Sequence, residues 1–353
     1  MATKANKKLS LVQIARALAI LFVLLGHANT LFYQNFRYQW FNMAQWGRTG
    51  GVDFFFIVSG FMIYYLYSKN IGVPGKAKDF LIKRVLRIFP MYWIFTLAAL
   101  SLFFIFPQLG DGHETKPLVI IKALVLIPGD PILVVTWSLS NVMFFYVLFT
   151  FLIYKPKLAK PVLGIWIVIS LLTAFKTPGF SKLEGFLFNF NNMEIVCGSL
   201  VAYLILNFKI KFPKLILLSG FLLIISVWTN NVLNGANETI YFYYCVAAML
   251  IMLGISSIDL SKDIKTPAPL QFLGDASYSI YISHGPLLQF YILLLKKLNI
   301  ISVVGVFPSM CIAITLSILS GCLVYIILEK PISLFVKRKI LDKKKKLIAT
   351  PAA

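Results

Sequence analysis

The 353-residue chain is 59% hydrophobic and only 13% charged, and its mean hydropathy is +0.82. This profile excludes an ordinary soluble globular protein and indicates an integral membrane protein. The net charge of +21 would also suit nucleic-acid binding, but the basic residues lie in short segments beside apolar runs and in the C-terminal tail. Attraction to anionic lipid explains that distribution better, so we expect a membrane-lipid partner and no nucleic acid.

Apolar runs of roughly 17 to 25 residues, separated by glycine, proline and charged residues, recur along the chain. They predict an all-α, polytopic fold of about ten transmembrane helices. The predicted spans are 9–32, 51–67, 82–106, 134–153, 161–175, 187–206, 213–229, 239–255, 277–295 and 302–328. A shorter run, 117–127, contains Lys122 and predicts an interfacial or re-entrant segment. Residues 1–353 are expected to form one membrane domain with a short basic tail, 330–353.

Lysine and arginine favour the cytoplasmic loops of membrane proteins. If the N-terminus is cytoplasmic, 26 of the 34 basic residues lie on the cytoplasmic side and 8 lie outside or at the interface. We therefore predict that both termini are cytoplasmic. The basic N-terminus continues into the first apolar run without a small-residue cleavage site, so we expect that run to be a retained helix.

The four cysteines lie in apolar runs and show no C-x-x-C spacing; they are Cys197, Cys245, Cys311 and Cys322. Metal sites and disulfide frameworks have characteristic cysteine spacings that this pattern lacks. We therefore expect neither a bound metal nor a disulfide framework.

The first predicted helix contains the segment RALAILFVLLGH, with Arg16 and His27 at its ends. Ionisable residues inside membrane spans cost about 2.5 kcal/mol or more, so a functional role is the default interpretation. Eleven residues at about 100° each bring both side chains to within about 20° of one helix face, roughly 16 Å apart along the axis. We expect both to face one cavity, Arg16 nearer the cytoplasm and His27 nearer the outer surface.

The second predicted helix begins at the outer surface with GGVDFFFIVSGF. Because the first two helices are antiparallel, Asp53 enters the membrane at nearly the depth of His27. Its carboxylate could orient the imidazole as a general base. Alternatively, Asp53 only caps its helix, since aspartate is favoured there. The flanking Gly50, Gly51 and Gly60 permit close helix approach.

The third predicted helix begins with KRVLRIFPMYW, which places Arg84 and Arg87 on neighbouring positions of one face. Two guanidinium groups can bind phosphate bidentately. The alternative is that they are membrane anchors at the cytoplasmic surface. Because Arg16 points inward at a similar depth, we favour an anion site.

The fourth predicted helix begins at the outer face with TWSLSNVMFFY. Trp137 could stack on a sugar ring, with Ser138 beside it, but tryptophan is also enriched at membrane interfaces. Glu194 lies further inside the membrane, in NMEIVCGSLVAYL, and we expect it to pair with Asn191, Asn192 or an arginine.

Two ionisable residues lie in the last predicted helices. His284, in SYSIYISHG, is either a structural histidine satisfied by nearby tyrosine and serine hydroxyls or a catalytic group. Glu329, at the inner end of the final helix, precedes Lys330 and Pro331. We expect it to pair with an arginine of the inner layer.

Seven segments resemble, in chain order, the signature segments of the acyltransferase-3 family of membrane-bound acyltransferases: RALAILFVLLGH, GGVDFFFIVSGF, RVLRIFPMYW, TWSLSNVMFFY, NMEIVCGSLVAYL, LGDASYSIYISHGPL and LEKP. The resemblance covers residues 10–335. It implies a protein of the bacterial inner membrane that takes an acyl group, most commonly acetyl, from cytoplasmic acyl-CoA. The expected acceptor is a hydroxyl of an extracytoplasmic glycan such as exopolysaccharide, capsule, O-antigen or peptidoglycan.

Carried over onto this sequence, the family's arginine-x10-histidine motif falls on Arg16 and His27, and its arginine-x-x-arginine motif on Arg84 and Arg87. Its acidic glycine-rich segment falls on Asp53. The resemblance thus implies that the arginines bind acyl-CoA, the donor substrate, and that His27, oriented by Asp53, takes the acceptor's proton. An acyl-histidine intermediate is the alternative.

The sequence also departs from the family pattern. Many members read WSLSxE in the fourth helix, whereas this chain has Asn141 and Val142 and no carboxylate there. Asn141, Asp53 or Glu194 must substitute, or the acceptor is handled differently. The chain has no extracytoplasmic hydrolase-like domain of the kind some members carry, so transfer is direct or uses a separate partner or a homo-oligomer. A transporter of an anionic solute is the competing interpretation, because buried basic residues among many helices also suit that function.

Overall fold

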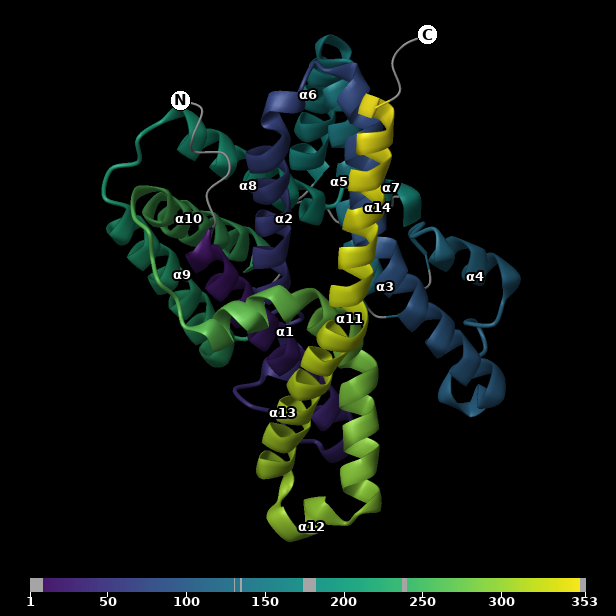
Figure 1. The fold of residues 1–353 in the computed structure, drawn as a ribbon. Coiled ribbons are helices and arrows are strands. Elements are labelled where there is room, and N and C mark those ends of the chain that lie inside the picture. Colours follow the sequence, from purple (N-terminus) through teal and green to yellow (C-terminus); the bar gives the residue numbers. More distant parts are fainter. Residues whose placement is uncertain (1–8, 130, 134, 174–181, 237–239, 350–353) are drawn as a thin grey trace.

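The computed structural model describes residues 9–129, 131–133, 135–173, 182–236 and 240–349, and within these ranges the chain is helical with no β-strand (Figure 1). The basic residues Lys4, Lys7, Lys8 and Lys176, which support the predicted topology, lie outside the described residues. All four cysteines are free thiols. The predicted all-α polytopic fold is confirmed.

Eight helices of the described chain are long and apolar enough to cross a membrane. They comprise or contain α1 (Ser10–Phe36), α2 (Gly51–Tyr67), α3 (Ala77–Ile105), α5 (Thr136–Tyr154), α6 (Pro156–Thr173), α9 (Pro213–Asn234), α10 (Ile240–Ser261) and α13 (Val306–Val324). The other two predicted spans are also helical, as α8 (Phe190–Asn207) and α11 (Ala268–Lys297). These two are more polar because they carry buried groups such as Glu194 and His284, and they pack against α2 and α1 inside the bundle.

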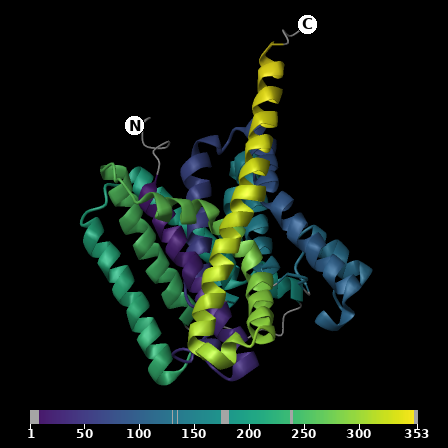
Figure 2. The same ribbon diagram turned by 60° about the horizontal axis from the view of Figure 1, so that its bottom comes forward.

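The final helix is unusually long. Helix α13 continues through a π-helical turn (Tyr325–Glu329) into α14 (Lys330–Ala349). The start of α1 and the end of α14 lie on the same side of the bundle (Figures 1 and 2). The shorter elements are α4 (Pro117–Leu124), α7 (Lys182–Leu187), α12 (Ile300–Val304) and the 3₁₀ turns Met43–Gln45, Ser68–Asn70, Pro74–Lys76 and Pro107–Leu109. With eight residues, α4 is too short to span a membrane.

Helices α2 and α8 pack backbone to backbone at two glycines. A Cβ atom on Gly60 would lie 1.7 Å from the carbonyl oxygen of Ile195, and one on Gly198 would lie 2.0 Å from that of Ile57. Ser199 Oγ donates a hydrogen bond of 3.1 Å to the Gly60 carbonyl across the same contact. Small residues drive helix association in membranes because they allow this close approach. The contact holds the polar face of α8 against α2.

A first prediction concerns this glycine contact. Replacing Gly60 or Gly198 with valine forces the two backbones apart, since no side-chain movement relieves a clash with a carbonyl oxygen. Overpacking of this kind costs about 1–3 kcal/mol or more. We expect a lower melting temperature and loss of monodisperse protein on gel filtration in detergent. Gly164→Val, where a Cβ meets nothing within 4 Å, serves as the control, and a normal melting temperature for Gly198→Val would contradict the packing.

Candidate functional site

Three cavities follow one another through the bundle and share walls. The inner cavity has a volume of about 310 Å³ and is lined by Arg16, Arg84 and Arg87. The middle cavity, about 150 Å³, is lined by His27, and it shares Val52 with the inner one. The outer cavity, about 330 Å³, contains Asn141 in its wall and shares Trp137 with the middle one. Arg16 and His27 were expected to face one cavity, but they line neighbouring cavities instead: Arg16 lines the inner one and His27 the middle one.

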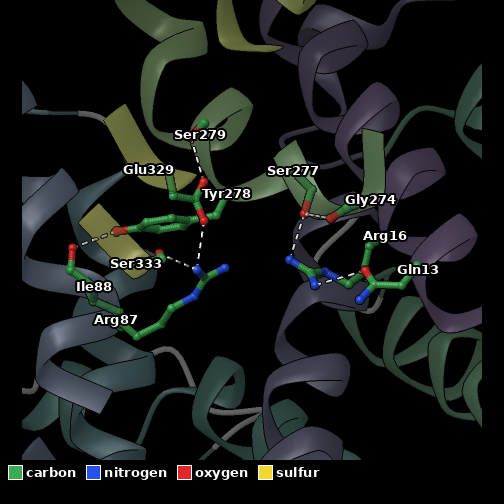
Figure 3. Close-up of polar contacts among 10 residues, drawn as sticks. All are labelled: Gln13, Arg16, Arg87, Ile88, Gly274, Ser277, Tyr278, Ser279, Glu329 and Ser333. Carbon is green, nitrogen blue, oxygen red and sulfur yellow. Dashed lines mark hydrogen bonds and ion pairs between the residues drawn. The ribbon is translucent and has the colours of Figure 1, made fainter. Parts of the chain in front are cut away.

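The three predicted arginines converge on the inner cavity. Arg16 donates to Gln13 Oε1 at 3.1 Å and to Ser277 Oγ at 2.8 Å. Figure 3 shows the guanidinium groups of Arg16 and Arg87 approaching the same space from opposite sides. Because Arg16 comes from α1 and Arg87 from α3, helix packing rather than local sequence creates this cationic pocket.

Arg87 is held by the final helix. Its Nη1 lies 2.8 Å from Glu329 Oε1, and its guanidinium lies over the Tyr278 ring at 5.7 Å (Figure 3). Glu329 also accepts a hydrogen bond of 2.6 Å from Ser279 Oγ. The expected pairing of Glu329 with an inner-layer arginine is thus present. It places a carboxylate from the π-helical turn beside Arg87, which lines the cavity.

Arg84 is held by aromatic rings instead of a carboxylate. Its guanidinium carbon lies 4.7 Å from the ring centre of Tyr67 and 5.9 Å from that of Tyr146. Its Nε is buried without a hydrogen-bond partner among the described residues. No ion pair to Arg84 is present in that part of the chain, so its charge is available to an anionic ligand in the cavity.

His27 lies at the middle cavity beside a second histidine. The ring centres of His27 and His284 are 4.9 Å apart. His284 is buried, its Nδ1 is bonded to the Tyr281 carbonyl oxygen, and its Nε2 has no partner among the described residues. Because Nδ1 serves as the donor in that bond, Nε2 is left as an acceptor. The structure therefore places the His284 ring next to the His27 ring, in a contact without a described hydrogen bond between them.

The expected contact between Asp53 and His27 is absent from the described hydrogen bonds and ion pairs. Instead, Asp53 Oδ1 lies 3.0 Å from Arg48 Nη1. The same nitrogen lies 3.7 Å from Glu194 Oε2, and Arg48 Nη2 donates to Asn191 Oδ1. Asp53 is fully buried, so its carboxylate takes the cation that approaches it from the preceding turn rather than the imidazole.

Arg48 is the main functional candidate that sequence reasoning missed. It lines the middle cavity with His27, and its guanidinium lies 5.3 Å from the Trp137 ring and 4.5 Å from the Tyr241 ring. It stands outside the predicted span, so charge counting treated it as an interfacial residue. Its place in GRTGG, five residues before Asp53, is the signal that could have identified it.

The start of α5 separates the cavities. Trp137 is half-buried and lies between the outer and middle cavities, while Ser138 faces the inner cavity and is hydrogen-bonded to the Tyr281 hydroxyl. Asn141 donates from Nδ2 to the Trp137 carbonyl at 2.9 Å, and its Oδ1 is buried without a partner among the described residues. Trp137 and Asn141 therefore line the outer cavity, whereas Ser138, from the same helix turn, lines the inner one.

Electrostatically, the cavities differ. The inner cavity presents three guanidinium groups, with Glu329 bound to one of them. In the middle of the bundle, one guanidinium, Arg48, faces two carboxyl groups. The inner end therefore attracts anions, whereas the cation beside His27 is already engaged by the protein.

Comparisons with known proteins identify a family and a relative of the chain. The model of the acyltransferase domain, Acyl_transf_3, matches residues 11–326. The chain is 26% identical over 301 residues to the exopolysaccharide production protein ExoZ of Rhizobium meliloti, an alignment that covers 80% of this chain and 88% of that protein. No solved structure matches the chain.

A second prediction tests the Arg48 cluster. Arg48→Met leaves Asp53 and Glu194 buried without their cation, and such a loss costs about 3–5 kcal/mol. We expect a clear fall in melting temperature in detergent, largely reversed when Asp53→Asn and Glu194→Gln are added. Arg37→Met, which removes an exposed arginine that lies over Tyr33, should melt like the wild type. An unchanged melting temperature for Arg48→Met would show that the cluster does not stabilise the fold.

Proposed function

The chain belongs to the acyltransferase family whose domain model spans residues 11–326, and from this premise we propose that it is a membrane O-acyltransferase. It moves an acyl group, most simply acetyl, from cytoplasmic acyl-CoA to a hydroxyl of an extracytoplasmic polysaccharide. The observation that carries the proposal is the series of cavities, with arginines at one end and His27 at its centre. The similarity to ExoZ, an exopolysaccharide production protein, supports an exopolysaccharide as the acceptor.

Acyl-CoA binds in the inner cavity, with its phosphate groups against Arg84, Arg16 and Arg87. Arg84 contributes the charge that no described carboxylate neutralises, and guanidinium groups bind phosphate bidentately. His27 lies eleven residues beyond Arg16, about 16 Å along the helix axis. The extended pantetheine arm covers that distance and brings the thioester to the middle cavity.

His27 removes the proton of the acceptor hydroxyl as its oxygen attacks the thioester carbonyl. The carbon–sulfur bond then breaks, and the imidazolium returns the proton to the CoA thiolate. Arg48 lines the same cavity, where its charge is engaged by Asp53 and lies beside Glu194. His284 packs its ring against that of His27, with ring centres 4.9 Å apart, whereas Asp53 is engaged by Arg48.

Membrane location and orientation complete the proposal. The protein spans the bacterial inner membrane with Arg16, Arg84 and Arg87 towards the cytoplasm and Trp137 towards the outside. The basic residues of the loops favour this orientation. A separate extracytoplasmic partner or a second copy of the chain is compatible with it.

Transport of an anionic solute remains the competing function, because a cationic cavity inside a helical bundle also suits a transporter. The two functions differ in one product. An acyltransferase releases free CoA in step with acceptor acylation, whereas a transporter moves its solute without cleaving a thioester.

A third prediction follows for His27. His27→Ala should lower acceptor acylation by about 10²–10⁴-fold, since it removes the general base, while the protein stays folded and still binds CoA. The readout is the O-acyl signal in NMR spectra of cell-surface polysaccharide from a deletion strain that carries each variant. His113→Ala, which removes a histidine of the loop after Pro107–Leu109, should restore the signal fully. Retained acylation in His27→Ala would rule out this base.

A fourth prediction concerns the donor. Arg84→Gln should raise the KM for acetyl-CoA about 10–100-fold, because a hydrogen bond to a charged group contributes about 1.5–3 kcal/mol. The maximal rate should change much less. Arg338→Gln, in the exposed basic tail, is the matched control. A KM equal to that of the wild type in Arg84→Gln would place the CoA phosphates elsewhere.

A further inference from the structure

The outer cavity is built from three segments that are far apart in the sequence. The first turns of α5 contribute Trp137, Ser140 and Asn141, and the segment after α4 contributes Pro128 and Gly129. Helix α7 and the start of α8 close the cavity; its lining residues there are Gly185, Phe186, Asn189 and Asn191. At about 330 Å³, the cavity is at the small end of ligand-binding pockets. It suits one or two sugar residues and not a long oligosaccharide.

The polar groups of this wall are amides and hydroxyls. No described lining residue of the outer cavity is charged. Asn141 is 2% exposed, and its Oδ1 has no hydrogen-bond partner in the described part of the chain. A buried acceptor without a partner is costly, so a ligand that donates a hydrogen bond to it gains more than from an exposed group. A sugar hydroxyl is such a donor.

Trp137 gives the cavity an aromatic surface in a fixed position. Its indole packs edge-on against Phe56, with ring centres 5.8 Å apart, and lies 5.3 Å from the Arg48 guanidinium. Indole rings combine a large apolar face with a polar N–H. Because Trp137 lines both the outer and the middle cavities, a ring stacked on it stands at the entrance to the His27 cavity.

Charge argues against an acidic sugar in this position. A carboxylate on the ligand would lose water and face the acceptor oxygen of Asn141 without a described cation in the wall. Arg48, beyond Trp137, is bound by Asp53 and lies beside Glu194. The side chain of Lys122 approaches the backbone of Gly129 but does not line the cavity. An uncharged sugar makes the same hydroxyl contacts without that cost.

We propose that the outer cavity is the acceptor subsite and that it takes an uncharged sugar residue, stacked on Trp137 and donating a hydroxyl hydrogen bond to Asn141 Oδ1. This inference rests on the proposed function for its role in catalysis, but the binding of the sugar can be measured without any acyl transfer. It predicts which class of polysaccharide is modified. The sugar next to the acylated hydroxyl is neutral.

The test uses the full-length protein in lipid nanodiscs and two probes, methyl glucoside and methyl glucuronide, with binding followed by saturation-transfer NMR. We expect the wild type to bind the glucoside at least about tenfold more tightly than the glucuronide, and Asn141→Leu to weaken glucoside binding by about tenfold. Asn207→Leu is the matched control, because Asn207 also donates from Nδ2 to the carbonyl four residues earlier but is exposed. Its glucoside affinity should equal that of the wild type.

Equal binding of the two probes, or unchanged glucoside binding in Asn141→Leu, would overturn the proposal. Melting temperatures verify that each variant is folded. If Asn141→Leu proves unstable, Trp137→Phe is the second variant; it keeps an aromatic face and should retain part of the glucoside binding. Failure of the proposed function has a different signature. His27→Ala should bind the glucoside like the wild type, so sugar binding without any CoA release by the wild type would reject acyl transfer and leave the sugar site intact.

Discussion

The ion pair between Arg48 and Asp53 is the interaction on which the middle of the bundle depends. It joins the turn before α2 to the first turn of that helix, and through Glu194 and Asn191 it reaches α8. A charge buried without a partner costs several kcal/mol, so these elements cannot separate independently. The glycine contact between α2 and α8 keeps the same surfaces in register. The walls of the His27 cavity are therefore fixed by polar contacts and not by apolar packing alone.

The inner cavity depends on a second device of this kind. Glu329 belongs to a π-helical turn within an otherwise α-helical segment, and π-helical turns are common at functional sites. The turn brings Glu329 to both Arg87 and Ser279, which come from α3 and α11. Arg87 is thus paired with a carboxylate, whereas the guanidinium group of Arg84 lies over aromatic rings. Arg84 and Arg87, three residues apart on one helix, therefore have different electrostatic surroundings.

Helix periodicity and charge placement predicted the helices and the gathering of Arg16, Arg84 and Arg87 at one depth, although Arg16 and His27 line neighbouring cavities and not a common one. They failed for Asp53, whose partner depends on how the preceding turn folds back. Arg48 was missed because a loop arginine next to glycines resembles an ordinary interfacial residue. The contact of His27 with His284 was equally out of reach, since it depends on how α1 and α11 pack and not on either sequence segment alone.

The middle cavity has less than half the volume of either neighbour, at about 150 Å³ against 310 and 330 Å³. In a transferase, this constriction has an energetic consequence. Neither the nucleotide nor the polysaccharide has to change sides, because only the acyl group passes from one to the other. No ion gradient and no alternation between inward-open and outward-open states is then required. In the proposed reaction, cleavage of the thioester itself makes the transfer directional, so acyl-CoA on one side of the membrane drives a modification on the other.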